Sequence, residues 1–189
     1  NFFSLGSADD DESWEADQSS AKDFESVLSI AKGCGAFTSM TLNWHYRSRH
    51  EALIAFSNNR FYSGGLTTFP SAQAEGPDVG VEFFLVPDGQ YDRGGSRRNM
   101  PEARFVARRI AHHYDTRPGM SLGVVAFSQP QADAIQLALD ELLLDRPDLE
   151  PHLHGSRLDA LFIKNLETVQ GDERDVMLFS VGYGPDQAG

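Results

Sequence analysis

The sequence predicts an α/β domain with three layers, in which a mainly parallel sheet lies between helices. Two apolar runs of strand length, at residues 122–127 and 176–181, point to buried strands. Between such runs lie stretches whose apolar residues recur at i, i+3 and i+4, the spacing of an amphipathic helix. With 189 residues and 40% hydrophobic content, the chain is long enough to form one sizeable core.

The first half of the chain is expected to hold two helices and a strand. A helix is predicted over residues 21–32, where apolar residues recur at helical spacing and glycines follow. Residues 38–44 alternate and are rich in β-forming types, which predicts a strand. Ser48 and Glu51 then form the S-x-x-E arrangement of a capping box, so a helix is predicted over residues 49–61.

The second half is expected to alternate between strands and helices. A strand over residues 81–86 is followed by a polar loop, and Asn99, Pro101 and Glu102 then indicate a helix start. Ser128 has the same role for the helix that follows the 122–127 strand. The expected elements of this half are strands at 81–86, 122–127, 161–163 and 176–181, and helices from 99 to about 114 and from 128 to about 142.

Ligands of parallel α/β sheets gather at the carboxyl ends of the strands. The residues that directly follow predicted strands are therefore the candidates for function. They are Tyr46 and Arg47, Ser128 and Gln129, and the segment from Lys164 to Thr168.

The net charge of −12 argues at first against a nucleic-acid partner, because such partners are bound largely by basic groups. Half of this excess lies in six acidic residues at positions 9–12, 15 and 17. We therefore expect a flexible acidic segment over residues 1–20 and a mildly acidic domain over residues 21–189.

Neither a membrane span nor a disulfide is expected. No run approaches the roughly 18 apolar residues that a spanning helix needs, and no basic-then-apolar leader opens the chain. Cys34 is the single cysteine, which favours a reducing compartment. These features predict a cytoplasmic protein without a membrane partner.

Two segments carry possible chemistry that residue type and spacing alone leave open. Arg47 and Arg49 flank Ser48 directly after a predicted strand, so they are either phosphate-binding groups or ordinary surface cations. Gln170 to Glu173 form a predicted turn before an apolar strand, either to hold polar groups against a ligand or as a solvated turn. A magnesium-dependent nuclease site of clustered carboxylates is a third alternative for the acids at 172, 173 and 175.

Three segments resemble motifs of the superfamily 1 DNA/RNA helicases, in the order that this family has. HYRSRHE at residues 45–51 and VQGDERDVMLFSVGYG at residues 169–184 are similar to two of its motifs, the second to motif V. SLGVVAFSQPQADAI at residues 121–135 is similar to the strand and helix between them. The chain is identified as a member of this family within its Upf1-like group, whose large bacterial members have a YDRGGSRRN-type loop like that at residues 91–99.

The resemblance implies a RecA-like fold of the P-loop NTPase type and a role as the second of two motor domains. ATP, with Mg²⁺ held mainly by the first motor domain, would bind between the two. Arg47 matches the arginine that contacts the γ-phosphate, and Tyr46 matches the residue whose ring lies against adenine. Glu173 matches the acid that hydrogen-bonds the ribose, and Gln170 and Gly171 belong to the same nucleotide-binding loop.

The resemblance also implies partners: single-stranded DNA or RNA and the first RecA-like domain of the same polypeptide. Ser128, Gln129 and Thr168 match positions that contact the nucleic-acid backbone. Arginines of the glycine-rich loop are either part of that groove or solvated; they are Arg93, Arg97 and Arg98.

The sequence departs from a complete motor. It has no G-x-x-x-x-G-K-[ST] phosphate loop, no strand ending in an Asp-Glu pair, and no final arginine motif before Gly189. The chain alone is therefore expected to be an inactive part of an ATP hydrolase. The alternative is a decayed RecA-like scaffold that only binds partners.

Overall fold

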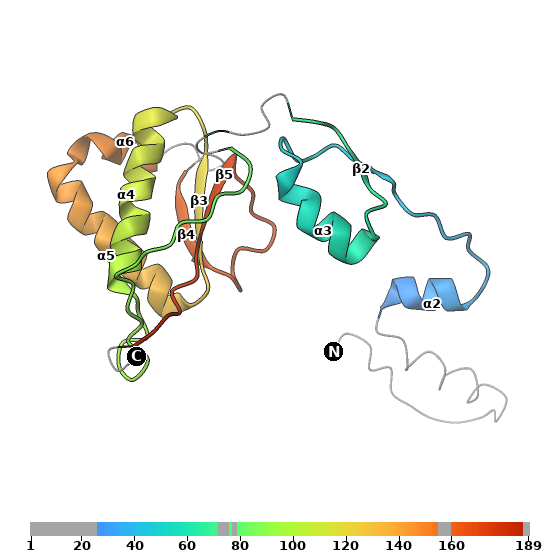
Figure 1. Cartoon of the computed structure of the whole chain (residues 1–189), viewed down its shortest axis with the longest axis horizontal. Coiled ribbons are helices and arrows are strands. Elements are labelled where there is room, and N and C mark those ends of the chain that lie inside the picture. The colour runs from blue at the N-terminus through green and yellow to red at the C-terminus, as the bar shows by residue number, and fades with distance from the viewer. Residues whose placement is uncertain (1–25, 72–75, 77–78, 155–159, 187–189) are drawn as a thin grey trace, which may run out of the picture. The chain divides into compact units, whose positions relative to one another are not determined.

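The computed structural model describes residues 26–71, 76, 79–154 and 160–186. The chain divides into two compact units, residues 1–82 and residues 83–189 (Figure 1). The predicted acidic segment, residues 1–20, lies outside the described residues, and the predicted boundary between it and one following domain stays a prediction.

A parallel sheet forms the centre of the second unit. Strand β3 (Leu122–Ala126) lies in the middle, with β4 (Phe162–Asn165) on one side and β5 (Val176–Ser180) on the other. Both neighbours run parallel to β3, and Val124 pairs with residues of each. These strands confirm the predicted α/β fold with a parallel sheet.

Two long helices pack against each other and against the sheet. Helices α4 (Met100–Thr116) and α5 (Gln129–Asp145) lie on the same side of the sheet in Figure 1. The 3₁₀ turn η1 (Pro147–Leu149) and the short helix α6 (Glu150–Leu153) follow α5. The core between these helices and the strands contains fully buried aliphatic side chains, including Ile110, Leu122, Val124, Ile135 and Leu139.

Both long helices begin as the sequence predicts. The side chain of Asn99 accepts a hydrogen bond from the Glu102 N–H at the start of α4, and Ser128 does the same for Gln131 at the start of α5. Each cap is followed two residues later by proline, which cannot donate a backbone N–H and is tolerated in the first helical turn. No helix of the described residues is both long and apolar enough to cross a bilayer.

The opposite face of the sheet is more open than the helix-covered face. Gly123, the second residue of β3, leaves space that Phe162 and Met177 of the neighbouring strands occupy. A Cβ atom at position 123 would lie 2.5 Å from the Phe162 ring and 2.8 Å from the Met177 sulfur. Phe179 is 60% exposed.

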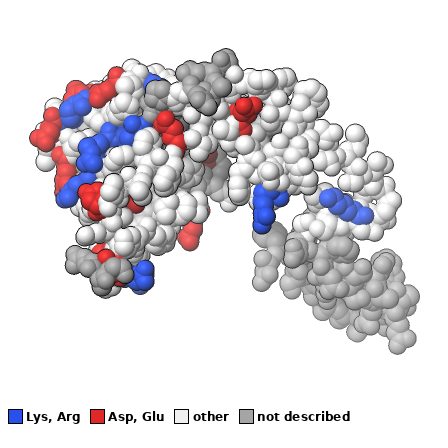
Figure 2. Space-filling view, in the orientation of Figure 1, with Lys and Arg blue, Asp and Glu red and all other residues white. Residues whose placement is uncertain are grey.

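The first unit has short elements: helix α2 (Val27–Gly33), strand β1 (Trp44–His45), helix α3 (Ala52–Tyr62) and strand β2 (Thr67–Thr68). β1 and β2 pair in parallel. No described residue of this unit is buried, and its surface in Figure 2 is mostly uncharged.

Two predicted strands are wrong in extent or absent. Residues 38–43 are not in a strand, and β1 contains only Trp44 and His45, because its partner β2 is also two residues long. Residues 81–86 form no strand. Phe84 instead lies against Phe105 of α4, with ring centroids 5.8 Å apart, and under the Arg109 guanidinium at 4.6 Å. Ring contacts with a helix therefore take the place of strand pairing there.

The predicted capping box at Ser48 and Glu51 is also wrong. Helix α3 begins at Ala52, and its N-cap residue, Glu51, has helical dihedral angles and makes no side-chain capping bond. The Ser48 hydroxyl instead lies 2.7 Å from Nε2 of His45.

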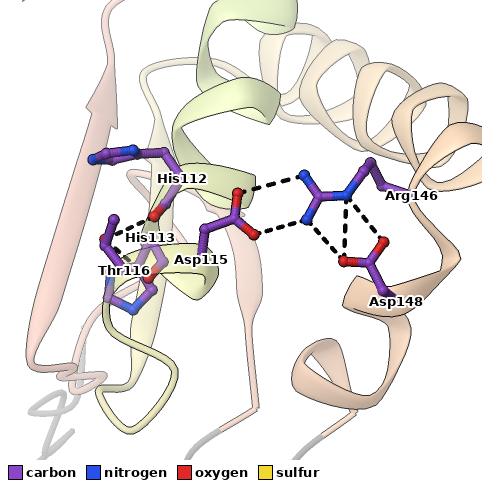
Figure 3. A network of polar contacts seen from close by, with 6 residues as sticks. All are labelled: His112, His113, Asp115, Thr116, Arg146 and Asp148. Carbon is purple, nitrogen blue, oxygen red and sulfur yellow. Dashed lines mark hydrogen bonds and ion pairs between the residues drawn. The ribbon is translucent and has the colours of Figure 1, made fainter.

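Arg146 joins the ends of the two long helices (Figure 3). Its guanidinium donates to Asp115 at the end of α4, with a shortest distance of 2.7 Å, and to Asp148 in η1 at 2.8 Å. Hydrogen bonds from Arg146 lower the pKa of both carboxyls. This ion-pair network fixes α4 to the turn after α5.

Candidate functional site

The carboxyl ends of β3 and β4 bring together the three residues predicted to contact nucleic acid. Gln129 accepts a hydrogen bond from the Asn165 amide at 3.0 Å, and the Thr168 hydroxyl donates to Oδ1 of Asn165 at 2.8 Å. Ser128 precedes Gln129 and caps α5. One continuous polar edge therefore follows the two strands.

Asn165 is the residue that joins this edge, and sequence reasoning gave it no role. It is the last residue of β4, and its side chain also accepts the Thr168 N–H at 2.9 Å. Its position within the 164–168 segment was the available signal. An amide can donate to one neighbour while it accepts from another, which is what this residue does.

A polar cluster lies at the carboxyl end of β5. The Glu102 carboxylate accepts hydrogen bonds from the Ser180 hydroxyl at 2.7 Å and from the Gly182 N–H at 3.0 Å. Gln131, which is only 1% exposed, accepts the Asn99 N–H at 2.8 Å and donates to the Ser180 hydroxyl at 3.2 Å. The cluster ties the starts of α4 and α5 to the residues that leave β5.

The turn that contains Gln170, Gly171 and Glu173 is held from the residues around it. Gly171 has φ of 91°, which L-residues rarely adopt, and the predicted tight turn is present. Gln170 and Glu173 are exposed. The neighbouring Asp172 carboxylate binds Nζ of Lys164 at 2.5 Å.

Arg174 fixes the other end of this turn. Its guanidinium donates to the Ala160 carbonyl at 3.0 Å and lies 4.7 Å from the centre of the Phe162 ring. The ring thus has Arg174 and Lys164 as cation partners, both of which belong to contacts that fix the turn. The backbone of residues 170–173 is therefore positioned from β4.

Tyr46 and Arg47 lie in an exposed turn of the first unit, directly after β1. Tyr46 is 85% exposed, and Arg47 is also exposed. Residues 26–71 contain four basic residues and one acidic residue, in contrast to the acidic chain as a whole. A local excess of positive charge suits an anionic ligand at this turn.

The glycine-rich loop at 91–99 is an ordered turn. Asp92 accepts hydrogen bonds from the backbone N–H and the hydroxyl of Ser96, at 2.6 and 2.8 Å. These bonds lower the pKa of Asp92, the backbone N–H of Ser96 most strongly. Arg93 and Arg97 are exposed on this loop, whereas Arg98 is half-buried.

The carboxylates proposed for a nuclease site are engaged elsewhere. Asp172 binds Lys164, and Asp175 accepts hydrogen bonds from the N–H and hydroxyl of Ser121. In the part of the chain that the structure describes, no three His, Cys, Asp or Glu residues are grouped so as to hold a metal ion.

Residues 24–184 match the AAA domain family, and these residues make up more than half of the chain. The chain belongs to this family. An uncharacterized ATP-dependent helicase of Mycoplasma genitalium is 36% identical to this AAA domain over 190 residues. That alignment covers 97% of the chain and 16% of the relative. Its homolog in Mycoplasma pneumoniae is 38% identical over 146 residues, covering 75% of the chain and 13% of the relative.

The AAA domain thus spans a minor part of the curated relatives that it matches. Family and relatives together confirm the predicted superfamily 1 helicase-like domain, and the parallel sheet agrees with a RecA-like, P-loop NTPase-type fold. The individual site residues stay predictions.

Proposed function

We propose that this chain is the second motor domain of an ATP-dependent DNA/RNA helicase, forming one wall of the ATP cleft and part of the single-strand track. The match to the AAA domain family and to two proteins named ATP-dependent helicases carries this proposal. The other wall belongs to a first RecA-like domain in the same polypeptide, which holds Mg²⁺ and most of the nucleotide.

The first-unit turn supplies the groups for the base and the γ-phosphate. The exposed ring of Tyr46 offers an apolar surface on which adenine can stack. The Arg47 guanidinium, in a segment with an excess of basic residues, suits a polyphosphate and stabilises charge that develops at the γ-phosphate. Arg47 is the catalytic residue of this proposal.

The turn at residues 170–173 supplies the remaining nucleotide contacts. Glu173 accepts hydrogen bonds from the ribose, which has donor hydroxyls but no charge. Gln170 and Gly171 belong to the same fixed turn. Gly171 has a positive φ there, which other residue types adopt only with backbone strain. This turn begins two residues after Thr168, so nucleotide and strand contacts are separated by a short segment.

The polar edge after β3 and β4 suits a nucleic-acid backbone. Gln129, Asn165 and Thr168 combine amide and hydroxyl donors on one edge. Such groups bind phosphate and sugar, which carry no sequence information. We expect binding that depends on salt and differs little between sequences.

The deciding experiment substitutes Arg47 in the full-length protein that contains this chain. Arg47→Ala is expected to lower the nucleic-acid-stimulated ATPase rate by on the order of 10³-fold, because the lost charge acts mainly in the transition state. Arg60→Ala is the matched control, an exposed arginine in the last turn of α3, and should turn over normally.

Strand affinity without nucleotide should be unchanged in both variants. Near-normal turnover in Arg47→Ala would make Arg47 a surface cation. A full-length protein without any ATPase activity would instead favour the decayed scaffold.

A further inference from the structure

The turn that presents Tyr46 and Arg47 is closed by one side chain. Nε2 of His45 accepts the Ser48 N–H at 3.2 Å and lies 2.7 Å from the Ser48 hydroxyl. His45 and Ser48 are half-buried, whereas the two residues between them are exposed. Closing the ends of a four-residue turn in this way fixes the direction of its two central residues.

The hydrogen-bond pattern determines which ring nitrogen carries the proton. A backbone N–H can only donate, so Nε2 has to be an unprotonated acceptor. The Ser48 hydroxyl lies 2.7 Å from the same nitrogen. An acceptor at Nε2 leaves Nδ1 as the ring nitrogen that carries a proton.

The position of His45 is fixed independently of the turn. It is the second residue of β1 and pairs with Thr68 of β2, while the Thr67 N–H donates to the Asn43 carbonyl at 2.6 Å. The backbone of His45 is thus held at the end of a strand, and its imidazole is in contact with Ser48. The N-cap residue of helix α3, Glu51, makes no side-chain capping bond, and the Ala52 N–H donates to Nδ1 of His50 and not to Ser48.

We propose that His45 is a positioning residue for ATP hydrolysis: its Nε2 holds the turn in which Tyr46 meets the base and Arg47 the γ-phosphate. This inference rests on the proposed function, since it concerns the same two ligand contacts. It assigns His45 no contact with the nucleotide. The required property of residue 45 is a hydrogen-bond acceptor at the Nε2 position.

The test compares His45→Leu with His45→Gln in the full-length protein. Leucine fills similar space without an acceptor, whereas the Gln side-chain oxygen lies close to where Nε2 lies in histidine. His45→Leu is expected to lower kcat by on the order of 10²-fold, the cost of misplacing a catalytic group by about 1 Å. KM for ATP should rise as well, because Tyr46 moves together with Arg47. His45→Gln should restore most of both.

Arg47→Ala, measured beside them, separates the two claims. If Arg47→Ala is inactive while His45→Leu is fully active, the positioning role is wrong and the proposed function stands. If His45→Leu and His45→Gln are equally impaired, the acceptor is not what matters and the inference is again overturned. If Arg47→Ala is active, Arg47 is only a surface cation, and the positioning role of His45 fails with the role of Arg47.

A spectroscopic measurement tests the turn without any activity. Ring ¹⁵N chemical shifts of His45 in this chain at neutral pH should show an unprotonated Nε2 and a protonated Nδ1. The Ser48→Ala variant keeps the backbone N–H donor, so the same tautomer should persist in it. A proton on Nε2 of the unmodified chain would overturn the inference.

Discussion

The two units of this chain differ in what holds them together. The second unit has a core of buried aliphatic side chains between two long helices and a sheet, whereas no described residue of the first unit is buried. The first unit relies on local contacts, such as the paired hydrogen bonds of the Asn58 side chain with Leu66 at 3.0 and 2.9 Å. Polar contacts can specify a turn, but stability comes mainly from burial. The second unit is therefore the stable scaffold.

Substitution of matched aliphatic residues gives the largest expected contrast between the units. Ile135 in α5 is fully buried, and Ile135→Ala should lower the free energy of unfolding by about 2–5 kcal/mol. Leu53 in α3 is 53% exposed, and Leu53→Ala should change it by less than about 0.5 kcal/mol. Denaturant unfolding of both variants measures the difference. Equal losses would show that the first unit has a core of its own.

Two glycines with positive φ sharpen the comparison within the second unit. Gly182 has φ of 75°, and a Cβ there would lie 3.0 Å from Cγ of the buried Gln131. Gly171 has φ of 91°, and nothing lies within 4 Å of its Cβ position. Both alanine variants carry backbone strain, but only Gly182→Ala also overpacks the polar cluster. It should therefore be less stable than Gly171→Ala by about 1–3 kcal/mol.

Thermal unfolding of the two glycine variants supplies the measurement. Gly171→Ala should leave the Asn99–Gln131 hydrogen bonds intact, which amide exchange at Asn99 would report. If both variants lose the same stability, Gln131 moves away at no cost and the cluster is looser than its distances indicate.

The smallest effect is expected at the ion-pair network of Arg146. The pKa values of Asp115 and Asp148 are lowered in the folded chain, chiefly by hydrogen bonds from Arg146. Their contribution to stability is therefore present above the ordinary carboxyl pKa of 3.8 and is lost as the pH falls through the lowered values. Arg146→Met should be slightly less stable at neutral pH, and the difference should shrink below about pH 4. Melting curves across this range test the direction, and a difference that grows with acid would contradict it.

Sequence patterns predicted the second unit better than the first. Asn99 and Ser128 mark the starts of α4 and α5 because a cap, a following proline and an apolar helical face all indicate the same boundary. The strand at 122–126 is apolar throughout and fully buried, so its continuous apolar sequence agrees with its burial. The three signals are independent of contacts elsewhere in the chain, which is why they succeed.

The wrong predictions depend on partners that a local pattern does not contain. Alternation at residues 38–44 suits a strand but does not provide the neighbour that a strand needs, and only Trp44 and His45 pair. Ser48 has the spacing of a capping residue, yet its hydroxyl lies against the imidazole of His45, three residues before it. The residues after the strand ends were predicted as candidates, and Asn165 was among them. Its particular role was not predicted, because that role consists of contacts to Gln129 and Thr168.

The close packing over Gly123 also limits how this sequence can change over time. Phe162 and Met177 both pack into the space where a side chain at position 123 would lie. The sizes of these three residues, each from a different strand, are therefore linked. A larger residue at 123 is tolerable only together with a smaller one at 162 or 177. Related AAA domains should therefore show these positions varying together, and a single replacement at 123 should be selected against even though it touches no ligand.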